Sequence, residues 1–162
     1  MTTYYTTIST NLLGPLILTA KDNGLTGIYF HASHFRQTIR SPKEQHDSHP
    51  ILQLAKKELT DYFLRKRTFF TVRLILTGTP FQQTVWEEVR KIPYGATATY
   101  QDIAMKIGNK KAVRAVGQAN KANQIPIIIP CHRVIGKNNN LVGYAGKQVD
   151  KKQLLLELEG AR

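Results

Sequence analysis

Hydrophobic and polar positions in the first part of the chain predict a β-hairpin followed by a helix. Apolar residues at 16–18 and 25–30 flank Asp22-Asn23-Gly24. An Asn-Gly pair between apolar runs is a strong hairpin signal. From Ile51 to Lys66 the apolar residues recur at helical spacing, which predicts a helix.

Two further segments complete the first half. The polar stretch 36–49 contains one proline and is followed by another, which predicts a surface loop. Residues 69–76 alternate loosely and predict a strand. The sequence Thr-Gly-Thr-Pro at 77–80 then interrupts the pattern. We therefore expect an N-terminal domain over residues 1–78 and a C-terminal domain over residues 79–162.

In the second half, the spacing of apolar residues predicts short helices. Helices are expected at about 81–91, 99–107, 111–119 and 149–159, the last ended by Gly160. Thr99 can cap its helix, and Asp102 three residues later completes a variant of the capping box. A Gly-Asn turn between the second and third helices indicates a helix-turn-helix, although ordinary helix packing explains the same apolar positions. These elements predict an α+β protein with a sheet-and-helix domain followed by a mainly helical domain.

The net charge of the chain and its distribution indicate a class of binding partner. The chain has 162 residues with 23 Lys and Arg against 11 Asp and Glu, for a net charge of +12. Between Val89 and Gln148 ten basic residues accompany one acid, Asp102. A surface selected for solubility alone would mix both signs, so this excess favours a nucleic-acid partner.

Other features of the sequence exclude several kinds of cross-link, metal site and targeting segment. A single cysteine excludes an intrachain disulfide and a Cys-rich zinc site. No apolar run reaches membrane-spanning length, and the first ten residues lack a signal-peptide pattern. We therefore expect a cytoplasmic protein with no membrane association.

The one cysteine lies in the most informative segment. An apolar run over residues 125–130 ends in Pro-Cys-His-Arg, which places Cys131 between a buried segment and a cationic turn. Free cysteines are usually small buried hydrophobes. The adjacent His132 and Arg133 favour the alternative, a reactive thiol whose thiolate they would stabilise.

The second half resembles the O⁶-alkylguanine-DNA alkyltransferase family. The matching pieces, in the family's order across residues 79–160, are TPFQQTVWEEVRKIPYGATATYQDIA, RAVGQA, IPIIIPCHRV, GYAG and LLLELEG. The resemblance implies a winged helix-turn-helix and direct reversal of DNA damage. O⁶-alkylguanine is flipped out of duplex DNA, and its alkyl group is transferred irreversibly to Cys131, once per molecule. We expect a monomer that needs no cofactor, and the resemblance leaves activity on O⁴-alkylthymine open.

The resemblance also implies a catalytic set around Cys131. His132 is the base that draws the thiol proton through a water, and Glu159 orients the histidine. Asn123 is a hinge that holds the two turns around the cysteine together. Tyr100 hydrogen-bonds the guanine and can protonate it as it leaves.

Further positions follow from the same resemblance. The alkyl pocket is lined by Val134, Tyr144, Ala145 and Gly146. Arg114 is the finger that fills the gap of the flipped nucleotide from the minor groove. The other positions implied in DNA binding are Tyr100, Ala115, Gly117, Gln118 and Lys121. Gln124 and Gln118 depart from the residues that the family usually has there.

Three rival interpretations remain at this point. A winged-helix module could bind DNA or its damage without catalysis, but the binding-only relatives lack the cysteine. A cysteine hydrolase could use Cys131, His132 and Glu159 with repeated turnover. The pairs His31/His34 and His46/His49 have a spacing that occurs in zinc sites, yet neither supplies enough ligands, so no metal is expected.

Overall fold

Three antiparallel strands form the centre of the N-terminal sheet. They are β1 (Thr3–Thr10), β2 (Gly14–Lys21) and β3 (Gly24–Tyr29). The short strand β4 (Lys43–Gln45) pairs in parallel with β1, which gives the order β3-β2-β1-β4. Lys21 pairs with Gly24 across a two-residue turn, so the predicted hairpin is confirmed.

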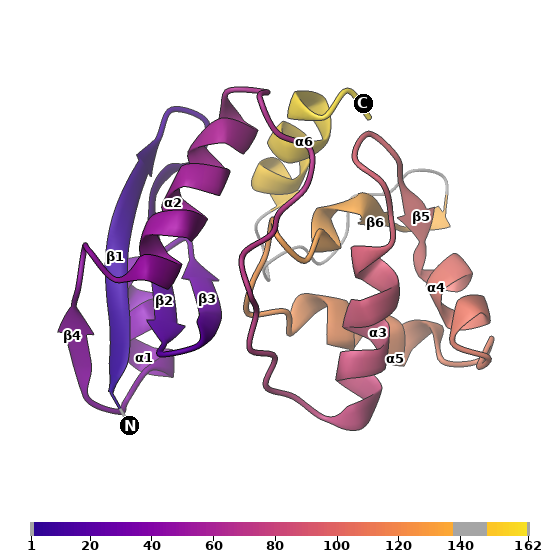
Figure 1. The fold of residues 1–162 in the computed structure, drawn as a ribbon. Helices are drawn as coiled ribbons and strands as arrows, with labels where there is room; N and C mark the ends of the chain where they lie inside the picture. The colour runs from indigo at the N-terminus through magenta and orange to yellow at the C-terminus, as the bar shows by residue number, and fades with distance from the viewer. Residues whose placement is uncertain (1, 138–148, 162) are drawn as a thin grey trace. The chain divides into compact units, whose positions relative to one another are not determined.

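Helices cover both faces of this sheet. Helix α2 (Pro50–Phe63) packs on β1, β2 and β3, and the short helix α1 (Ala32–Thr38) lies on the opposite face (Figure 1). Pro50 occupies the first turn of α2, where its missing N–H is not needed, and the His49 ring accepts from the Ile51 N–H at 3.2 Å. The large side chains of α2 and the sheet that are fully buried include Leu16, Leu18, Leu52, Leu59 and Tyr62. Each contributes about 1.5–3 kcal/mol by leaving water.

Two predictions for this half are wrong. The stretch 36–49 is not a continuous loop, because it contains the end of α1 and all of β4. Residues 69–76 form no regular strand. A single bridge joins them to β3. In it, the Leu25 N–H donates to Arg73 O and the Ile75 N–H donates to Leu25 O, both at 2.8 Å.

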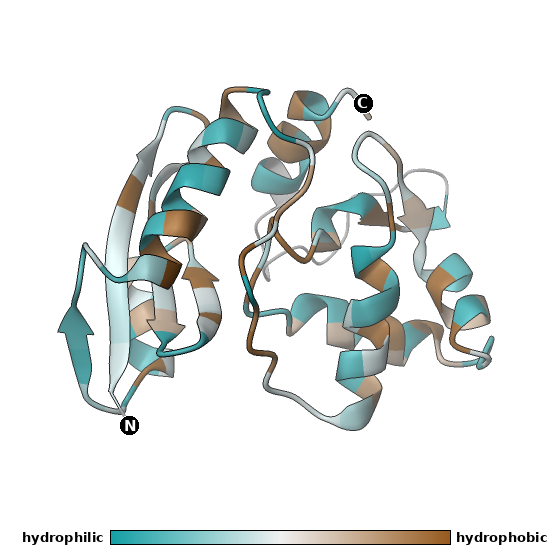
Figure 2. Ribbon diagram, viewed as in Figure 1, coloured by the Kyte–Doolittle hydropathy of each residue, from teal (hydrophilic) through white to brown (hydrophobic). Residues whose placement is uncertain are grey.

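The C-terminal half is mainly helical, as predicted. Its helices are α3 (Pro80–Arg90), α4 (Tyr100–Lys106), α5 (Val113–Lys121) and α6 (Val149–Leu158). Hydrophilic and hydrophobic positions alternate along α2 and α3 (Figure 2), which is the pattern of helices with one buried side. The α+β class predicted from the sequence is confirmed.

Helices α4 and α5 form the helix-turn-helix. The Thr99 side chain accepts from the Asp102 N–H, and the Asp102 carboxylate accepts from the Thr99 N–H, so the predicted capping box is present. Gly108 follows α4 with φ of +77°, a conformation that favours glycine. Helix α5 begins at Val113, two residues later than the sequence suggested.

The structure describes residues 2–137 and 149–161, and the chain divides into two compact units, Met1–Leu76 and Thr77–Arg162. In the second unit, the Trp86 indole N–H donates to Ala119 O at 2.8 Å and joins α3 to α5. Strands β5 (Ala98–Thr99) and β6 (Val134–Ile135) pair in parallel. Within the described ranges, every helix is too short or too polar to cross a membrane.

Candidate active site

Cys131 begins a short turn that joins a buried segment to a strand. Residues 125–129 are almost entirely buried, the 3₁₀ turn η1 covers Cys131–Arg133, and β6 follows directly. The side chain of Cys131 is 3% exposed. The thiol is therefore enclosed by protein, and a reacting group must be brought to it.

The loop before Cys131 is tight and is held by Asn123. Ile127 has φ of +75°, which a β-branched residue adopts only at a cost of about 1–3 kcal/mol. The Asn123 side chain accepts from the Ile125 N–H and donates to Ile129 O, each at 2.9 Å. One amide thus bridges both ends of the loop that carries the strained residue.

Two other side chains donate to the backbone around Cys131. From α5, the Asn120 amide nitrogen donates to Cys131 O at 3.2 Å. From α6, the fully buried Lys152 ammonium donates to Val134 O and lies 5.7 Å from the centroid of the Tyr100 ring. Donors from two helices therefore fix the backbone on both sides of the turn.

Glu159 joins the two residues that follow Cys131. Its carboxylate lies 2.7 Å from His132 Nε2 and accepts from Arg133 Nε at 2.8 Å and Nη2 at 3.0 Å. Arg133 Nη1 also donates to Ile92 O at 2.7 Å. All three charged or polar groups are at least nine-tenths buried, so their mutual pairing offsets the cost of removing them from water.

The pKa values of Glu159 and His132 assign their protonation states. Burial alone would raise the pKa of Glu159, but hydrogen bonds from His132 and Arg133 outweigh it and lower the pKa to about 2. Burial lowers the pKa of His132 despite the attraction of Glu159. A carboxylate only accepts hydrogen bonds, so a neutral His132 carries its proton on Nε2 and presents Nδ1 as a base.

Cys131 is a thiol rather than a thiolate in this environment. Burial raises its pKa to about 11, although a hydrogen bond from Asn123 and the charge of Lys152 oppose the rise. The expectation that the charges of the adjacent His132 and Arg133 would stabilise the thiolate is wrong, although the backbone N–H of His132 does lower the pKa of Cys131. Burial keeps His132 neutral, and Arg133 is paired with Glu159.

Tyr100 lies at the first position of α4. Burial raises the pKa of its phenol, the neighbouring Cys131 raises it further, and a hydrogen bond from Asn120 opposes both effects. The phenol is therefore protonated at neutral pH, and it lies close enough to Cys131 for a thiolate there to raise its pKa. Five predicted catalytic residues belong to the second unit: Tyr100, Asn123, Cys131, His132 and Glu159.

Most of the residues predicted to bind DNA lie on α5. Arg114, Ala115, Gln118 and Lys121 are exposed, and Gly117 is half-buried. A Cβ atom added at Gly117 would lie 4.0 Å from Tyr100 Cδ1, so this face of the helix passes close to the tyrosine ring. Of the predicted pocket residues, Val134 is fully buried in β6, whereas Tyr144, Ala145 and Gly146 lie outside the described residues.

Sequence reasoning overlooked three side chains at this site: Asn120, Arg133 as a partner of Glu159, and Lys152. Asn120 precedes Asn123 by one helical turn, which is a signal that both amides could reach the same loop. Lys152 lies about two helical turns before Glu159, the residue that directly follows α6, so a continued helical spacing places the two on the same side. Nothing in the sequence around Arg133 distinguishes a buried guanidinium from one on the surface.

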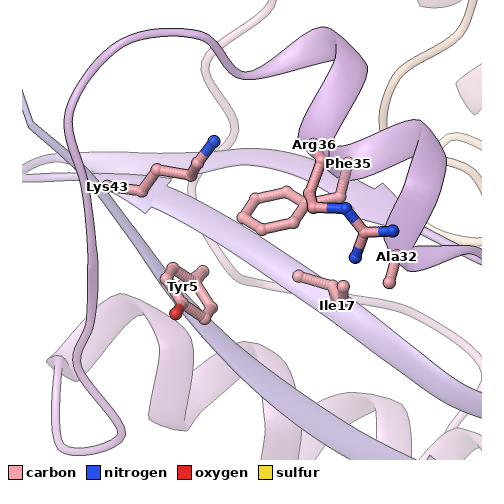
Figure 3. A pocket seen from close by; sticks show the side chains of 6 residues that line it. All are labelled: Tyr5, Ile17, Ala32, Phe35, Arg36 and Lys43. Carbon is pink, nitrogen blue, oxygen red and sulfur yellow. The ribbon is translucent and has the colours of Figure 1, made fainter.

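The histidine pairs and a surface pocket belong to the first unit. The rings of His46 and His49 pack edge to face with centroids 5.4 Å apart, and His34 packs on Tyr29. The pocket has a volume of about 350 Å³ and is lined by Tyr5, Ile17, Ala32, Phe35, Arg36 and Lys43 (Figure 3). The Lys43 ammonium lies over the Phe35 ring and donates to Ile39 O at 2.7 Å, so it is already engaged.

Family models match both halves of the chain. The model described as "6-O-methylguanine DNA methyltransferase, DNA binding domain" matches residues 80–161. The model described as "6-O-methylguanine DNA methyltransferase, ribonuclease-like domain" matches residues 3–76. Together they account for nearly the whole chain.

Individual relatives match over almost their full length. The constitutive methylated-DNA–protein-cysteine methyltransferase of Bacillus subtilis is 45% identical over 159 residues, which cover 96% of this chain and 94% of the relative. The crystal structure of Mycobacterium tuberculosis OGT in complex with DNA has a TM-score of 0.86 at 41% identity, with 99% and 94% of the two chains covered. The crystal structure of the M. tuberculosis O⁶-methylguanine methyltransferase has a TM-score of 0.83 at 39% identity over the same shares.

Proposed function

This chain belongs to the O⁶-alkylguanine-DNA alkyltransferase family, and we propose that Cys131 is the cysteine to which it transfers the alkyl group. The protein repairs DNA by direct reversal of alkylation damage, with a cysteine of its own as the acceptor. One observation carries the assignment to Cys131: the chain contains no other cysteine.

The transfer is a nucleophilic substitution at the alkyl carbon. The Cys131 sulfur forms a C–S bond as the bond from carbon to guanine O⁶ breaks, and the electron pair of that bond passes to the purine. The product is a thioether and a restored guanine. No step regenerates the thiol, so each molecule reacts once.

Protons must move as sulfur attacks. A thiol whose pKa is about 11 is a weak nucleophile at neutral pH, so its proton has to leave during the attack. We assign the base to His132 Nδ1, acting through a water, and the orientation of the imidazole to the Glu159 carboxylate at 2.7 Å from Nε2. Tyr100 supplies a proton to the leaving guanine, and solvent restores both groups afterwards.

DNA delivers the substrate through the helix-turn-helix. The exposed residues of α5 contact duplex DNA from the minor groove, and Arg114 fills the gap left by the flipped nucleotide. Val134, Tyr144, Ala145 and Gly146 line the alkyl pocket. In this proposal residues 79–162 hold the chemistry, residues 1–78 form a separate domain, and the protein acts as a cytoplasmic monomer.

A mass measurement tests the acceptor. After incubation with duplex DNA that carries one O⁶-methylguanine, the intact protein should gain the mass of one methyl group, and peptide mapping should place it on Cys131. Additional substrate should give no second turnover. Repaired DNA beside an unmodified Cys131, or sustained turnover, contradicts the proposal.

Cys131→Ser provides the matched control. Serine keeps nearly the same size, but its hydroxyl is a far weaker nucleophile than a thiol, so methyl transfer should be abolished. DNA affinity should remain within about twofold of the unsubstituted protein, because the substitution leaves the exposed face of α5 unchanged. Loss of both properties together would indicate a folding defect.

A further inference from the structure

Arg133 is a buried arginine held by three hydrogen bonds. It directly follows His132 in the turn η1. Its Nε and Nη2 donate to the two carboxylate oxygens of Glu159 at 2.8 and 3.0 Å, and its Nη1 donates to Ile92 O at 2.7 Å. The guanidinium carbon also lies 5.8 Å from the centroid of the Tyr94 ring. Because a guanidinium is a rigid fork, these contacts hold it in a single orientation against the carboxylate.

His132 and Arg133 bond to the same carboxylate oxygen. His132 Nε2 lies 2.7 Å from Glu159 Oε2, which also accepts from Arg133 Nη2 at 3.0 Å. Since both contacts end on one atom, the guanidinium lies within the range of about 4–6 Å over which a charge changes the protonation of another group. The position of Arg133 is therefore set with respect to the imidazole as well as to the carboxylate.

The pairing of Arg133 with Glu159 decides which protonation state of His132 is favoured. Together the guanidinium and the carboxylate carry no net charge, so an imidazolium beside them would be a buried net positive charge, which is costly. Beside Glu159 alone, an imidazolium would instead complete an ion pair and would be favoured. Burial lowers the pKa of His132 most, Glu159 raises it, and the charge of Arg133 lowers it again.

The remaining groups near His132 do not reverse this balance. Lys152 is fully buried on α6 and donates to Val134 O, and its charge also lowers the pKa of His132. Cys131 is uncharged as a thiol. Arg133 is the cation that bonds to the carboxylate oxygen facing the imidazole.

We propose that Arg133 is a positioning residue that neutralises Glu159 and fixes its carboxylate, so that His132 stays uncharged and its Nδ1 can take the thiol proton. This inference rests on the proposed role of His132 as the base. A base that already carries a proton at neutral pH cannot accept another one. The proposed transfer needs the proton to pass from Cys131 through water to Nδ1, and Arg133 keeps that nitrogen available.

Arg133→Gln removes the charge and keeps an amide that can donate to Glu159. A proton on His132 is then favoured, so the pH below which single-turnover transfer slows should rise by about one unit or more. Below that pH, transfer from duplex DNA carrying O⁶-methylguanine should slow about tenfold per pH unit, and at alkaline pH it should recover. Equal slowing at every pH, with an unmoved profile, overturns the proposal.

Arg133→Lys separates the charge from the geometry. Lysine keeps the positive charge but lacks the fork that bridges two oxygens. The protein should be less stable, yet the pH profile of transfer should stay within about 0.3 unit of that of the unsubstituted protein. A shift as large as that of Arg133→Gln would mean that the charge is not the cause, and it would reject the proposal.

The protonation of His132 can also be measured without the reaction. Nitrogen NMR of histidine-labelled protein, with His132→Gln to assign one of the five histidines, should show a neutral ring protonated at Nε2 at neutral pH. In Arg133→Gln the same ring should titrate at higher pH. An imidazolium at neutral pH in the unsubstituted protein overturns the proposal, a result that holds even if Arg133→Gln does not fold. Absence of methyl on Cys131 would instead refute the proposed function, so the two failures are distinct.

Arg67→Gln is the matched control. Arg67 Nη1 lies 3.1 Å from Oε2 of Glu58, a carboxylate that is 1% exposed in the first unit. The substitution therefore also removes an arginine from a buried carboxylate and should lower the melting temperature. Transfer should stay within about twofold at every pH. A shift of the pH profile in Arg67→Gln would make the effect a general result of losing an ion pair and would reject the positioning role.

Discussion

At the scale of single residues, the proposed acceptor Cys131 combines a nucleophilic atom with almost complete burial. An exposed cysteine would ionise readily and react with any electrophile, whereas Cys131, with its pKa raised to about 11, stays a thiol. Reactivity then depends on groups that move the proton during the attack. The same burial that protects the thiol makes His132 and Glu159 necessary to the proposed chemistry.

Glu159→Gln should destabilise the protein. The carboxylate has a pKa of about 2 in the folded protein against an ordinary value of 4.5, a difference equivalent to about 3 kcal/mol. The substitution also leaves the buried Arg133 guanidinium without its charged partner. The free energy of unfolding at pH 7, measured by urea denaturation, should fall by about 3 kcal/mol.

The pH dependence follows from the direction of that shift. A lowered pKa means that the stabilisation is complete above about pH 4.5 and is lost as the pH falls toward 2. The difference between Glu159→Gln and the unsubstituted protein should therefore shrink across this interval, and a constant difference refutes the assignment. Glu157→Gln, an exposed position on the same helix, should stay within about 0.5 kcal/mol at every pH.

The residues of the proposed site differ in how far the sequence could predict them. Cys131 and His132 are adjacent in a distinctive string, and local sequence suffices to single them out. The pairing of Arg133 with Glu159 links positions that are 26 residues apart, so it depends on how α6 packs against the turn. The raised pKa of Cys131 likewise depends on burial by distant segments, which adjacent residues do not encode.

At the scale of elements, helices could be predicted where their own sequence contains capping residues at the start or a glycine at the end. Thr99 and Asp102 specify the start of α4, and Gly108 specifies its end, so this helix was predictable within one residue. Strand β1 consists largely of residues that favour strands, threonine, tyrosine and Ile8, but it lacks the run of aliphatic residues that indicated β2 and β3. Its pairing with β2 and β4 depends on tertiary structure and was not predictable from this segment alone.

The exposed start of α5 leads to a prediction about DNA. Arg114→Ala should weaken duplex binding and lower the dependence of log Kd on log salt concentration by about 1, the contribution of one phosphate contact. It should also slow transfer from duplex DNA while leaving transfer from the free O⁶-methylguanine base unchanged. Binding assays across a salt series and single-turnover assays on both substrates provide the measurements.

Arg90→Ala is the control for that substitution. Arg90 is a partly exposed arginine on α3 and lies 3.5 Å from Glu87, so its charge is partly compensated. It should have little effect on either substrate. If Arg114→Ala slows the free base as strongly as the duplex, the residue has no role in filling the gap of a flipped nucleotide.

At the scale of the whole molecule, the single cysteine lies in the stretch from Val89 to Gln148 that holds ten basic residues and one acid. The sequence predicted a DNA partner from the net charge of +12, and its second half carried the family resemblance. In the first half the hairpin and one helix were predicted correctly, whereas α1 and β4 were not predicted. Their sequences are short and polar and have little conformational preference of their own. The adjoining sheet therefore determines their conformation.

Alkylation should destabilise the protein that results from it. Cys131 is 3% exposed, so a methyl group added to its sulfur is buried as well, and any part of it that the alkyl pocket does not hold crowds the neighbouring side chains. Overpacking of this kind costs about 1–3 kcal/mol, so the melting temperature should fall by several degrees after the reaction. Calorimetry before and after complete transfer measures the change. Cys131→Ser incubated with the same DNA should show no shift, and an unchanged melting temperature of the alkylated protein contradicts the prediction.

The indole of Trp86 has a practical consequence beyond its contact with Ala119. The chain contains one tryptophan, it is 3% exposed, and it lies between α3 and α5 in the second unit. Emission from this single fluorophore therefore reports on the second unit without contribution from a tryptophan in the first. Fluorescence and circular dichroism followed in the same denaturation series would separate the two units optically, in the unlabelled protein.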